Sequence, residues 1–518
     1  MMVKYCNRIL LLLLLLAVAP SLWAQRLIQY ESGMGSRDPN NSDVWILYQG
    51  VHAMHDGMHL YADSALLDMK RNDFTAFRNI RIEISDTTTL TGDHLVYNGN
   101  TKIINIRGKQ VILVDGATIL MTDKLTYDRN ANLAFYDTWG HSSNNDINLE
   151  SRIGRYDANV KEFYIYNDVV LFDTSARLET DTLLYNTINH TAYFVSPTHI
   201  YSDSATMYSE EGFYNTSTNY ALSTKASHVW THDHHQLTGD TLHYYHDSKH
   251  GLAYGHVWLF DSVNNVACMG GFGESNQEQH FSIVTDSAFV LQVDSHGDSL
   301  FLIADTIQVV NNEDRQLETV TAFRTVHMFR NDVQAICDSL FYRAADSMMA
   351  LYHNPVVWYD TFQCSADTVF IYRDSSGLRL AQLRNNTFAF EQLDPQKFNQ
   401  VKGRHCDVHF LKGEPTYADV MGSAEMLYYI TEESPQHRKL LIGVNYGLGS
   451  DMRIYFENRQ PNRVVTMGNP DMQTYPFELL PADKHRLKGF RLLVNERPQR
   501  SDYLFYDVAP SKVANNKR

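Results

Sequence analysis

The chain has 518 residues, of which 60 are acidic and 44 are Lys or Arg, so its formal net charge is −16. This acidic balance argues against a nucleic-acid partner, because affinity for nucleic acid depends mainly on Lys and Arg contacts to phosphates. The four cysteines beyond residue 24 are too few and too scattered for a disulfide scaffold or a Cys-x-x-Cys metal site. The 31 Tyr and 25 Phe favour strands, since aromatic side chains suit half-buried pleated surfaces.

Residues 1–24 are predicted to form a secretory signal peptide. Lys4 and Arg8 precede a leucine-rich run, Ile9–Ala19, which is shorter than a transmembrane helix requires. A short stretch ending in Ala24 follows, and we expect cleavage after that residue. No later hydrophobic run reaches membrane-spanning length, so the sequence predicts an exported, soluble protein.

A short phrase, Asp-x-Leu-x-Tyr followed by Asn or Asp, recurs along residues 25–395. Well-preserved copies begin at residues 93, 123, 181, 240 and 338, and degenerate copies fill the gaps between them. The first positions are 63, 93, 123, 152, 181, 210, 240, 269, 305, 338 and 367. A spacing of 29 or 30 residues up to residue 269, with longer loops beyond, predicts one supersecondary unit stacked many times.

The repeated unit is predicted to be β. The Asp, Leu and Tyr of each phrase stand at alternate positions, so they share one face of an extended strand. A turn signal such as Asn98-Gly99-Asn100 follows, and then a second β-rich run such as Glu162–Tyr166. No window before residue 395 has a helical stripe of apolar residues with caps. We therefore predict an all-β chain of long, quasi-linear form.

The recurring aspartate has a structural and a functional interpretation. Catalysis needs one constellation of residues, whereas this Asp is present in nearly every unit. We interpret it as a residue that caps the corner where the chain turns into the strand, rather than as part of a ladder of cation sites.

A group of histidines between residues 228 and 256 is a second candidate for metal binding. His232, His234 and His235 suit Zn²⁺ or Cu²⁺ by residue type. They lie in a predicted loop between units, and no Cys or Glu completes a known ligand spacing, so we expect neither a metal nor another cofactor. Cys337 and Cys364 each lie just before adjacent phrases, and a disulfide between them stays open.

The last quarter of the chain differs in composition, with a predicted boundary near Pro395. Residues 395–518 carry 18 Lys or Arg against 14 acidic residues, and nine of the 13 prolines. We predict a further β segment over residues 396–470. Residues 471–518 are predicted to hold a short helix over Pro481–Lys488 and a polar tail over Ala509–Arg518.

The apolar face of the repeat remains as the candidate site, because motifs of the common enzyme classes are absent. One interpretation is ordinary core. The other is an elongated hydrophobic groove for acyl chains, in which a chain of about 14 carbons gains roughly 10 kcal/mol of gross driving force. The groove candidates are Leu95, Tyr97, Leu125, Tyr127, Leu183, Tyr185, Leu242 and Tyr244.

Several segments resemble the OstA-like (LptA-type) family of lipopolysaccharide-transport proteins, in particular the long stand-alone OstA-like proteins of Bacteroidota-type bacteria. They are the signal peptide, the phrase Gly92–Tyr97, the companion strand Gly255–Phe260, and Val420–Tyr429. The resemblance covers roughly residues 40 to 470. It implies an extended repeat β-jellyroll, in which two antiparallel sheets form an open, taco-like V that holds the acyl chains of lipid A.

The resemblance also implies a function and partners. We expect a non-enzymatic periplasmic carrier or bridge for lipopolysaccharide or a related lipid in outer-membrane assembly, free or associated with the outer membrane. Other jellyroll transport proteins are expected to join through edge strands, with an outer-membrane assembly partner at one end. Two departures are the long units of 29 to 30 residues and the acidic body, which does not suit phosphorylated lipid A.

Two alternatives stay open. An outer-membrane β-barrel of alternating strands fits the length of the exported chain, but barrels usually have lipid-facing apolar bands with aromatic girdles. A parallel β-helix that binds polysaccharide is the other alternative. It is expected to show a single cluster of carboxylates or basic residues on one rung, and the sequence has none.

Overall fold

The structure is a computed structural model that describes residues 27–506 except 145, 233, 263–264, 294–296, 315 and 434–438. The predicted signal peptide and polar tail lie outside these residues. The described part contains 37 strands and four short 3-10 helices, so the prediction of an all-β fold is confirmed. None of the described helices has the length and apolar character needed to span a membrane.

Compact regions of the chain divide it into two units. Unit 1 comprises the described residues up to Asp203 together with Glu210–Ser217, and unit 2 comprises Ser204–Ser209 and the residues from Thr218 onward. The strands of unit 1 are β1 (Gln29–Asp38), β2 (Asn41–His55), β3 (Met58–Asp68), β4 (Asp73–Glu83), β5 (Thr88–Asn98), β6 (Ile103–Asp115), β7 (Thr118–Asp128), β8 (Leu133–Tyr136), β9 (Gly140–Asn144), β10 (Ile147–Ser151), β11 (Ile153–Asp157), β12 (Glu162–Phe172), β13 (Ala176–Asn186), β14 (Thr191–Phe194), β15 (Thr198–Ser202) and β17 (Glu211–Asn215).

Unit 2 holds the remaining strands and the 3-10 helices. The strands are β16 (Ala205–Ser209), β18 (Tyr220–Lys225), β19 (Ser227–Thr231), β20 (His235–Gly239), β21 (Thr241–Tyr245), β22 (His250–Asp261), β23 (Val266–Asn276), β24 (Phe281–Val293), β25 (Ser299–Asn311), β26 (Leu317–Phe329), β27 (Val333–Arg343), β28 (Met348–Tyr352), β29 (Val356–Tyr359), β30 (Phe362–Ser365), β31 (Thr368–Asp374), β32 (Gly377–Gln392), β33 (Phe398–Leu411), β34 (Glu414–Glu433), β35 (Lys439–Glu457), β36 (Gln460–Met467) and β37 (Asp471–Tyr475). The 3-10 helices are η1 (Phe477–Leu479), η2 (Ala482–Lys484), η3 (Val494–Glu496) and η4 (Arg500–Tyr506).

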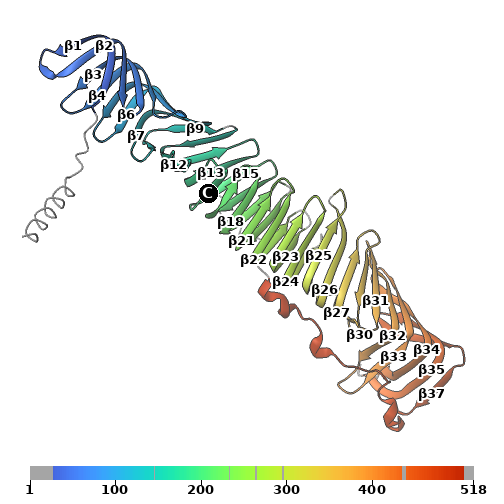
Figure 1. Ribbon diagram of the computed structural model, residues 1–518. Helices are drawn as coiled ribbons and strands as arrows, with labels where there is room; N and C mark the ends of the chain where they lie inside the picture. Colours follow the sequence, from blue (N-terminus) through green and yellow to red (C-terminus); the bar gives the residue numbers. More distant parts are fainter. Residues whose placement is uncertain are drawn as a thin grey trace, which may run out of the picture. The chain divides into compact units, whose positions relative to one another are not determined.

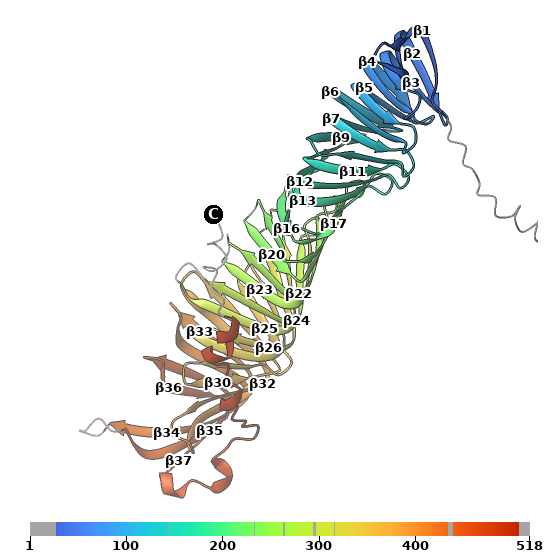
Figure 2. The same ribbon diagram turned by 90° about the vertical axis from the view of Figure 1, so that its left-hand side faces the viewer.

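Consecutive long strands pair antiparallel, and each of them bends at a corner near its middle. Strand β4 pairs with β5 over Asp73–Phe77, skips two residues, and pairs again over Ile80–Glu83. The skipped residues, Arg78 and Asn79, have the left-handed φ values of 61° and 49°. Every long strand thus contributes one half to each of two antiparallel half-sheets, and the succession of strands within each unit is visible in Figures 1 and 2.

We call the half-sheet that holds the Leu and Tyr of each phrase the phrase half-sheet, and the other the facing half-sheet. The two meet at the corners and enclose a common interior, and the open side between their turns is called the mouth. We call each bent strand of the stack a rung. Some rungs are interrupted at the corner and consist of two short strands, such as β8 and β9, each of which belongs to one half-sheet. Strand β8 pairs with the end of β7, and β9 pairs with its start. The predicted open V of stacked antiparallel strands is therefore the fold observed.

The recurring aspartate lies at the corner. Asp63 Oδ2 accepts a hydrogen bond from Asn79 Nδ2 at 2.8 Å, and Asp367 accepts one from Asn386 Nδ2 at 3.0 Å. Both asparagines are left-handed residues at the corner of the next long strand. The carboxylate therefore holds a backbone conformation that L-residues adopt reluctantly, which explains why it recurs once in each unit.

The last residue of the phrase builds the turn that follows it. Asn98 Oδ1 accepts hydrogen bonds from the backbone N–H groups of Asn100 and Thr101, at 3.0 and 2.7 Å. Successive turns are also joined to one another, since the N–H of Gly99 donates to the carbonyl oxygen of Asn72 at 2.8 Å. These side-chain-capped turns stack in line and fix the repeat at 29 or 30 residues.

The chain after the last strand of unit 2 runs along the outer face of the facing half-sheet and packs on it. We call residues 476–503 the C-terminal segment; Figure 1 shows it in red, returning from β37 toward β24. Leu480 and Leu487 pack on Phe388 and Phe398, and Tyr503 packs on Phe289, Phe301 and Phe329. Within the predicted helix Pro481–Lys488 the structure has a single 3-10 turn, η2.

Candidate functional site

The structure places the predicted groove residues in the interior between the half-sheets. In unit 1, Leu95, Tyr97, Leu125, Tyr127, Leu183 and Tyr185 are each no more than 1% exposed. In unit 2, Leu242 is equally buried and Tyr244 is partly exposed. The side chains of the phrase therefore occupy the interior of unit 1 themselves.

Polar side chains close the mouth of unit 1. Arg129, in the turn after β7, donates to Tyr97 OH at 3.0 Å and to the carbonyl oxygens of His55 and Asp56 at 3.3 and 3.1 Å. Lys102 Nζ lies 2.8 Å from Asp56 Oδ2. Because His55 and Asp56 end the facing half-sheet and the two basic residues end the phrase half-sheet, these contacts join the two across the mouth.

A second contact of this kind centres on Asp115, whose side chain is 1% exposed. The carboxylate accepts hydrogen bonds from Lys161 Nζ at 2.5 Å, Tyr156 OH at 2.8 Å and Thr88 Oγ1 at 3.1 Å. Burial, with Asp115 as a further cause, raises the pKa of Tyr156 and raises that of Tyr127 to about 12. In unit 1 the side chains of the phrase are thus buried, and polar groups join the two half-sheets across the mouth.

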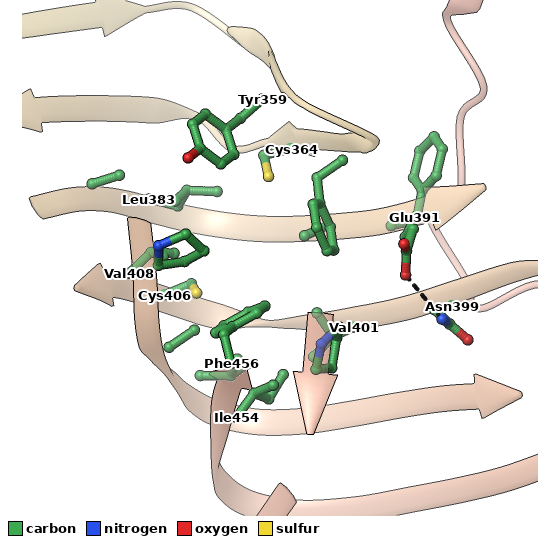
Figure 3. Close-up of a pocket in the computed structure, with 18 of the residues that line it drawn as sticks. Tyr359, Cys364, Leu383, Glu391, Asn399, Val401, Cys406, Val408, Ile454 and Phe456 are labelled. Atoms are coloured by element: carbon green, nitrogen blue, oxygen red, sulfur yellow. Dashed lines mark hydrogen bonds between the residues drawn. The ribbon is translucent and has the colours of Figure 1, made fainter. Parts of the chain in front are cut away.

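An apolar cavity lies between the half-sheets in the C-terminal part of unit 2. It contains about 1150 Å³ of atom-free space, including the part open to solvent. Figure 3 shows lining residues from β29, β30, β32, β33 and β35, among them Tyr359, Leu383 and Ile454, around this space. The residues that line it are Val333, Val357, Tyr359, Phe362, Cys364, Val369, Ile371, Leu378, Ala381, Leu383, Ala389, Phe390, Glu391, Asn399, Gln400, Val401, Cys406, Val408, Phe410, Pro415, Ala418, Val420, Met426, Leu427, Tyr428, Ile454, Phe456, Pro461 and Val464.

The cavity lies where three of the strands lack the tyrosine of the phrase. Counting four residues from the corner, the position of Tyr97 corresponds to Ile371, Val408 and Ile454. Each of these side chains is smaller than tyrosine and lines the cavity. Sequence reasoning missed this region, although the departure from the phrase was the signal that marked it.

Two tyrosines reach across the mouth of the cavity. Tyr359 OH donates to the carbonyl oxygen of Gly413 at 2.9 Å, and Tyr428 OH donates to that of Pro461 at 3.4 Å. Both tyrosines belong to the facing half-sheet. Gly413 lies in a turn of the phrase half-sheet, and Pro461 lies near the start of β36 in the same half-sheet. Burial raises the pKa of each hydroxyl, so both remain neutral donors at physiological pH. These contacts are single neutral hydrogen bonds, in contrast to the charged groups at the mouth of unit 1.

All four described cysteines are free thiols, so Cys337 and Cys364 form no disulfide. Cys364 and Cys406 line the cavity, and burial raises the pKa of Cys364 to about 12. A thiol that keeps its proton behaves as a small apolar side chain, and these two add to the apolar lining.

The histidine group forms no metal centre within the described part of the chain. His235 Nε2 lies 3.6 Å from Asp261 Oδ1, which is a partly exposed pair rather than a ligand set. Across the residues that the structure describes, no three His, Cys, Asp or Glu side chains are grouped closely enough to hold a metal ion.

Comparison with known proteins finds a family model and solved structures that are similar to this chain. A family model described as "OstA-like protein" matches residues 30–181 and 147–240. A crystal structure of LptH, the LptA-homologous periplasmic component of the lipopolysaccharide transport device from Pseudomonas aeruginosa, is 13% identical. That match covers 21% of this chain and 77% of LptH, with a TM-score of 0.19. No curated protein matches. The cavity lies C-terminal to the residues that the family model covers.

Proposed function

We propose that this protein, which belongs to the OstA-like family through residues 30–240, is a non-enzymatic periplasmic carrier or bridge that holds lipid acyl chains in the cavity of unit 2. The ligand proposed is lipopolysaccharide or a related lipid on its way to the outer membrane. The observation that carries the proposal is an apolar space enclosed by two half-sheets and open to solvent.

The energetics of the cavity favour a hydrocarbon ligand. Its lining is aliphatic, aromatic or thiol apart from a few polar groups at its edges. Each CH₂ group moved from water into such a space gains about 0.8 kcal/mol, so an acyl chain has a large gross driving force for entry. Water or a polar ligand gains much less from an apolar lining, because few groups there can hydrogen-bond to it.

The predicted groove residues of unit 1 are proposed as a second stretch of the lipid path. Their side chains face the interior of unit 1, and a lipid reaches them only when the contacts of Asp56 and Asp115 across the mouth are broken. Partner proteins are proposed to join at the edge strands β1, which pairs with β2, and β36, which pairs with β35.

Site-specific photo-crosslinking tests this function with a matched pair of aromatic positions. Phe410 lines the cavity, whereas Tyr417 on the next strand stacks on His409 outside it, at 4.3 Å between ring centroids. A benzophenone amino acid is placed at either position in the full chain, in cells that make lipopolysaccharide. We expect lipid adducts from position 410 and few from position 417. Equal labelling at the two positions, or none at either, contradicts the proposal.

A further inference from the structure

One end of the cavity carries a buried carboxylate. Glu391 is 4% exposed, lies on the facing half-sheet and lines the cavity. It stands directly opposite Asn399 on β33 and Phe362 on β30 in the strand register. Figure 3 shows Glu391 and Asn399 together at one end of the lining, apart from Leu383, Cys406 and Val408.

The Glu391 carboxylate accepts fewer hydrogen bonds from the described residues than its two oxygens can accept. Glu391 Oε2 accepts a hydrogen bond from Asn399 Nδ2 at 3.1 Å, and Oε1 accepts a long one from Thr361 Oγ1 at 3.4 Å. No ion pair reaches Glu391 from the residues that the structure describes. A carboxylate accepts about four hydrogen bonds, and a buried one that lacks donors is costly, so a further donor at this point is stabilising.

Asn399 fixes the direction of this group. Its Oδ1 accepts the backbone N–H of Tyr429 at 2.9 Å, so its amide nitrogen is turned to Glu391. The opposite face of the same strand is held by the C-terminal segment, because Gln400 bonds the carbonyl oxygen of His485 and the N–H of Leu487, at 3.0 and 2.9 Å. The position of the carboxylate is therefore held by its hydrogen bond to Asn399, and β33, which carries Asn399, is held in turn by the C-terminal segment.

We propose that Glu391 is the acceptor for the polar end of the bound chain, and that the cavity selects hydrocarbon chains bearing a hydrogen-bond donor, a hydroxyl or an amide N–H. A free carboxylate or phosphate at that point is disfavoured, because two like charges repel in a buried site. This inference rests on the proposed hydrocarbon binding and adds the chemical class of the group beside the chain.

Three ligands of one chain length test the selection in the unaltered protein. Tetradecanol offers a donor, methyl tetradecanoate offers only acceptors, and tetradecanoate is an anion. Their dissociation constants for the purified full chain are measured by displacement of a fluorescent hydrophobic dye. We expect tetradecanol to bind about 10-fold more tightly than the ester, as a hydrogen bond to a charged group implies, and tetradecanoate to bind most weakly.

The variant Glu391→Gln then removes the charge and keeps the shape of the side chain. We expect its preference for the alcohol over the ester to fall toward unity and its affinity for tetradecanoate to rise. Glu425→Gln is the matched control, because Glu425 lies on neighbouring β34 but bonds Lys402 and Tyr446 instead of lining the cavity. That control keeps the roughly 10-fold preference.

The outcomes separate the two proposals. If the unaltered protein binds all three ligands equally, or if Glu391→Gln keeps the preference, the role of Glu391 is wrong while hydrocarbon binding stands. If the unaltered protein binds none of the three, hydrocarbon binding fails and the inference fails with it. The comparison of ligands on the unaltered chain decides the matter even where Glu391→Gln does not fold.

Discussion

The interior of unit 1 and the C-terminal part of unit 2 are built on the same bent strands but filled differently. In unit 1 the phrase tyrosines, such as Tyr97 and Tyr127, are buried and lie beside charged contacts across the mouth. In unit 2 the equivalent positions carry Ile371, Val408 and Ile454, and a cavity lies between the half-sheets. The two regions share their corners and turns, and they differ in the inward-facing residues, which leave a cavity in the C-terminal part of unit 2.

Restoring the tyrosine is expected to have the largest effect. Val408→Tyr puts the tyrosine of the phrase into the cavity. We expect the affinity for lipid to fall at least about 100-fold, because the tyrosine ring takes the space in which burial of the acyl chain contributes several kcal/mol of binding free energy. Dye displacement on the purified chain measures this.

His409→Tyr is the control for Val408→Tyr, since His409 is the next residue on β33 and its side chain stacks on Tyr417 outside the cavity. The control is expected to bind as the unaltered protein does. Full binding by Val408→Tyr would show that ligand sits elsewhere.

Removing the buried carboxylate of unit 1 is expected to have the next largest effect. Asp115→Ala leaves the hydroxyl of Tyr156 and the ammonium of Lys161 without their acceptor, and we expect a loss of about 3 kcal/mol in the free energy of unfolding. Urea denaturation measures the loss. Asp137→Ala, which removes the exposed partner of Lys124, is expected to cost less than about 1 kcal/mol. If the two substitutions lowered the free energy of unfolding equally, Asp115 would not stabilise the mouth of unit 1 as proposed.

High pH is expected to destabilise unit 1 through its buried tyrosines. Burial raises the pKa of Tyr136 to about 12. The unfolded chain loses this proton near pH 10 and the folded one does not, so the free energy of unfolding falls as pH rises from 10 to 12. We expect about 1 to 2 kcal/mol per such tyrosine. Urea denaturation at several pH values in this range gives the free energy of unfolding as a function of pH. For Tyr136→Phe this free energy should fall less steeply with pH than for the unaltered protein. An equally steep fall would contradict the raised pKa of Tyr136.

The smallest expected effect concerns the mouth of the cavity. Tyr428→Phe removes one long hydrogen bond, that to the carbonyl oxygen of Pro461, and leaves the ring in place. We expect dye to dissociate about 2-fold faster in stopped-flow measurements, since a weak neutral hydrogen bond contributes about 0.5 kcal/mol. Slower dissociation would mean that this hydroxyl does not restrain the mouth.

The repeat could be predicted from the sequence because its determinants are local. The alternation of Asp, Leu and Tyr fixes which side chains point inward, and residues such as Asn98 build turns within three positions of themselves. Residue type and spacing are enough to find such features. The same reasoning placed Leu95 and Tyr97 on the interior face.

The cavity and the C-terminal segment could not be predicted in the same way. The cavity arises where side chains leave a space unfilled. That depends on packing among residues as far apart as Val333 and Val464, which are 131 positions apart. The C-terminal segment follows contacts such as Gln334 with Arg497, 163 residues apart, and not a helical pattern. This explains why Pro481–Lys488 contains a single 3-10 turn where the sequence predicted a helix.

The C-terminal segment changes how unit 2 comes apart. A stack of rungs that touch only their neighbours frays one rung at a time from its ends. This segment contacts Tyr446 on β35 through Lys484 and Phe301 on β25 through Tyr503, so it ties together rungs that have no contact of their own. Unfolding of any one rung between β25 and β35 therefore disturbs the contacts of the C-terminal segment with the others. We expect the strands that line the cavity to unfold together, in one cooperative step.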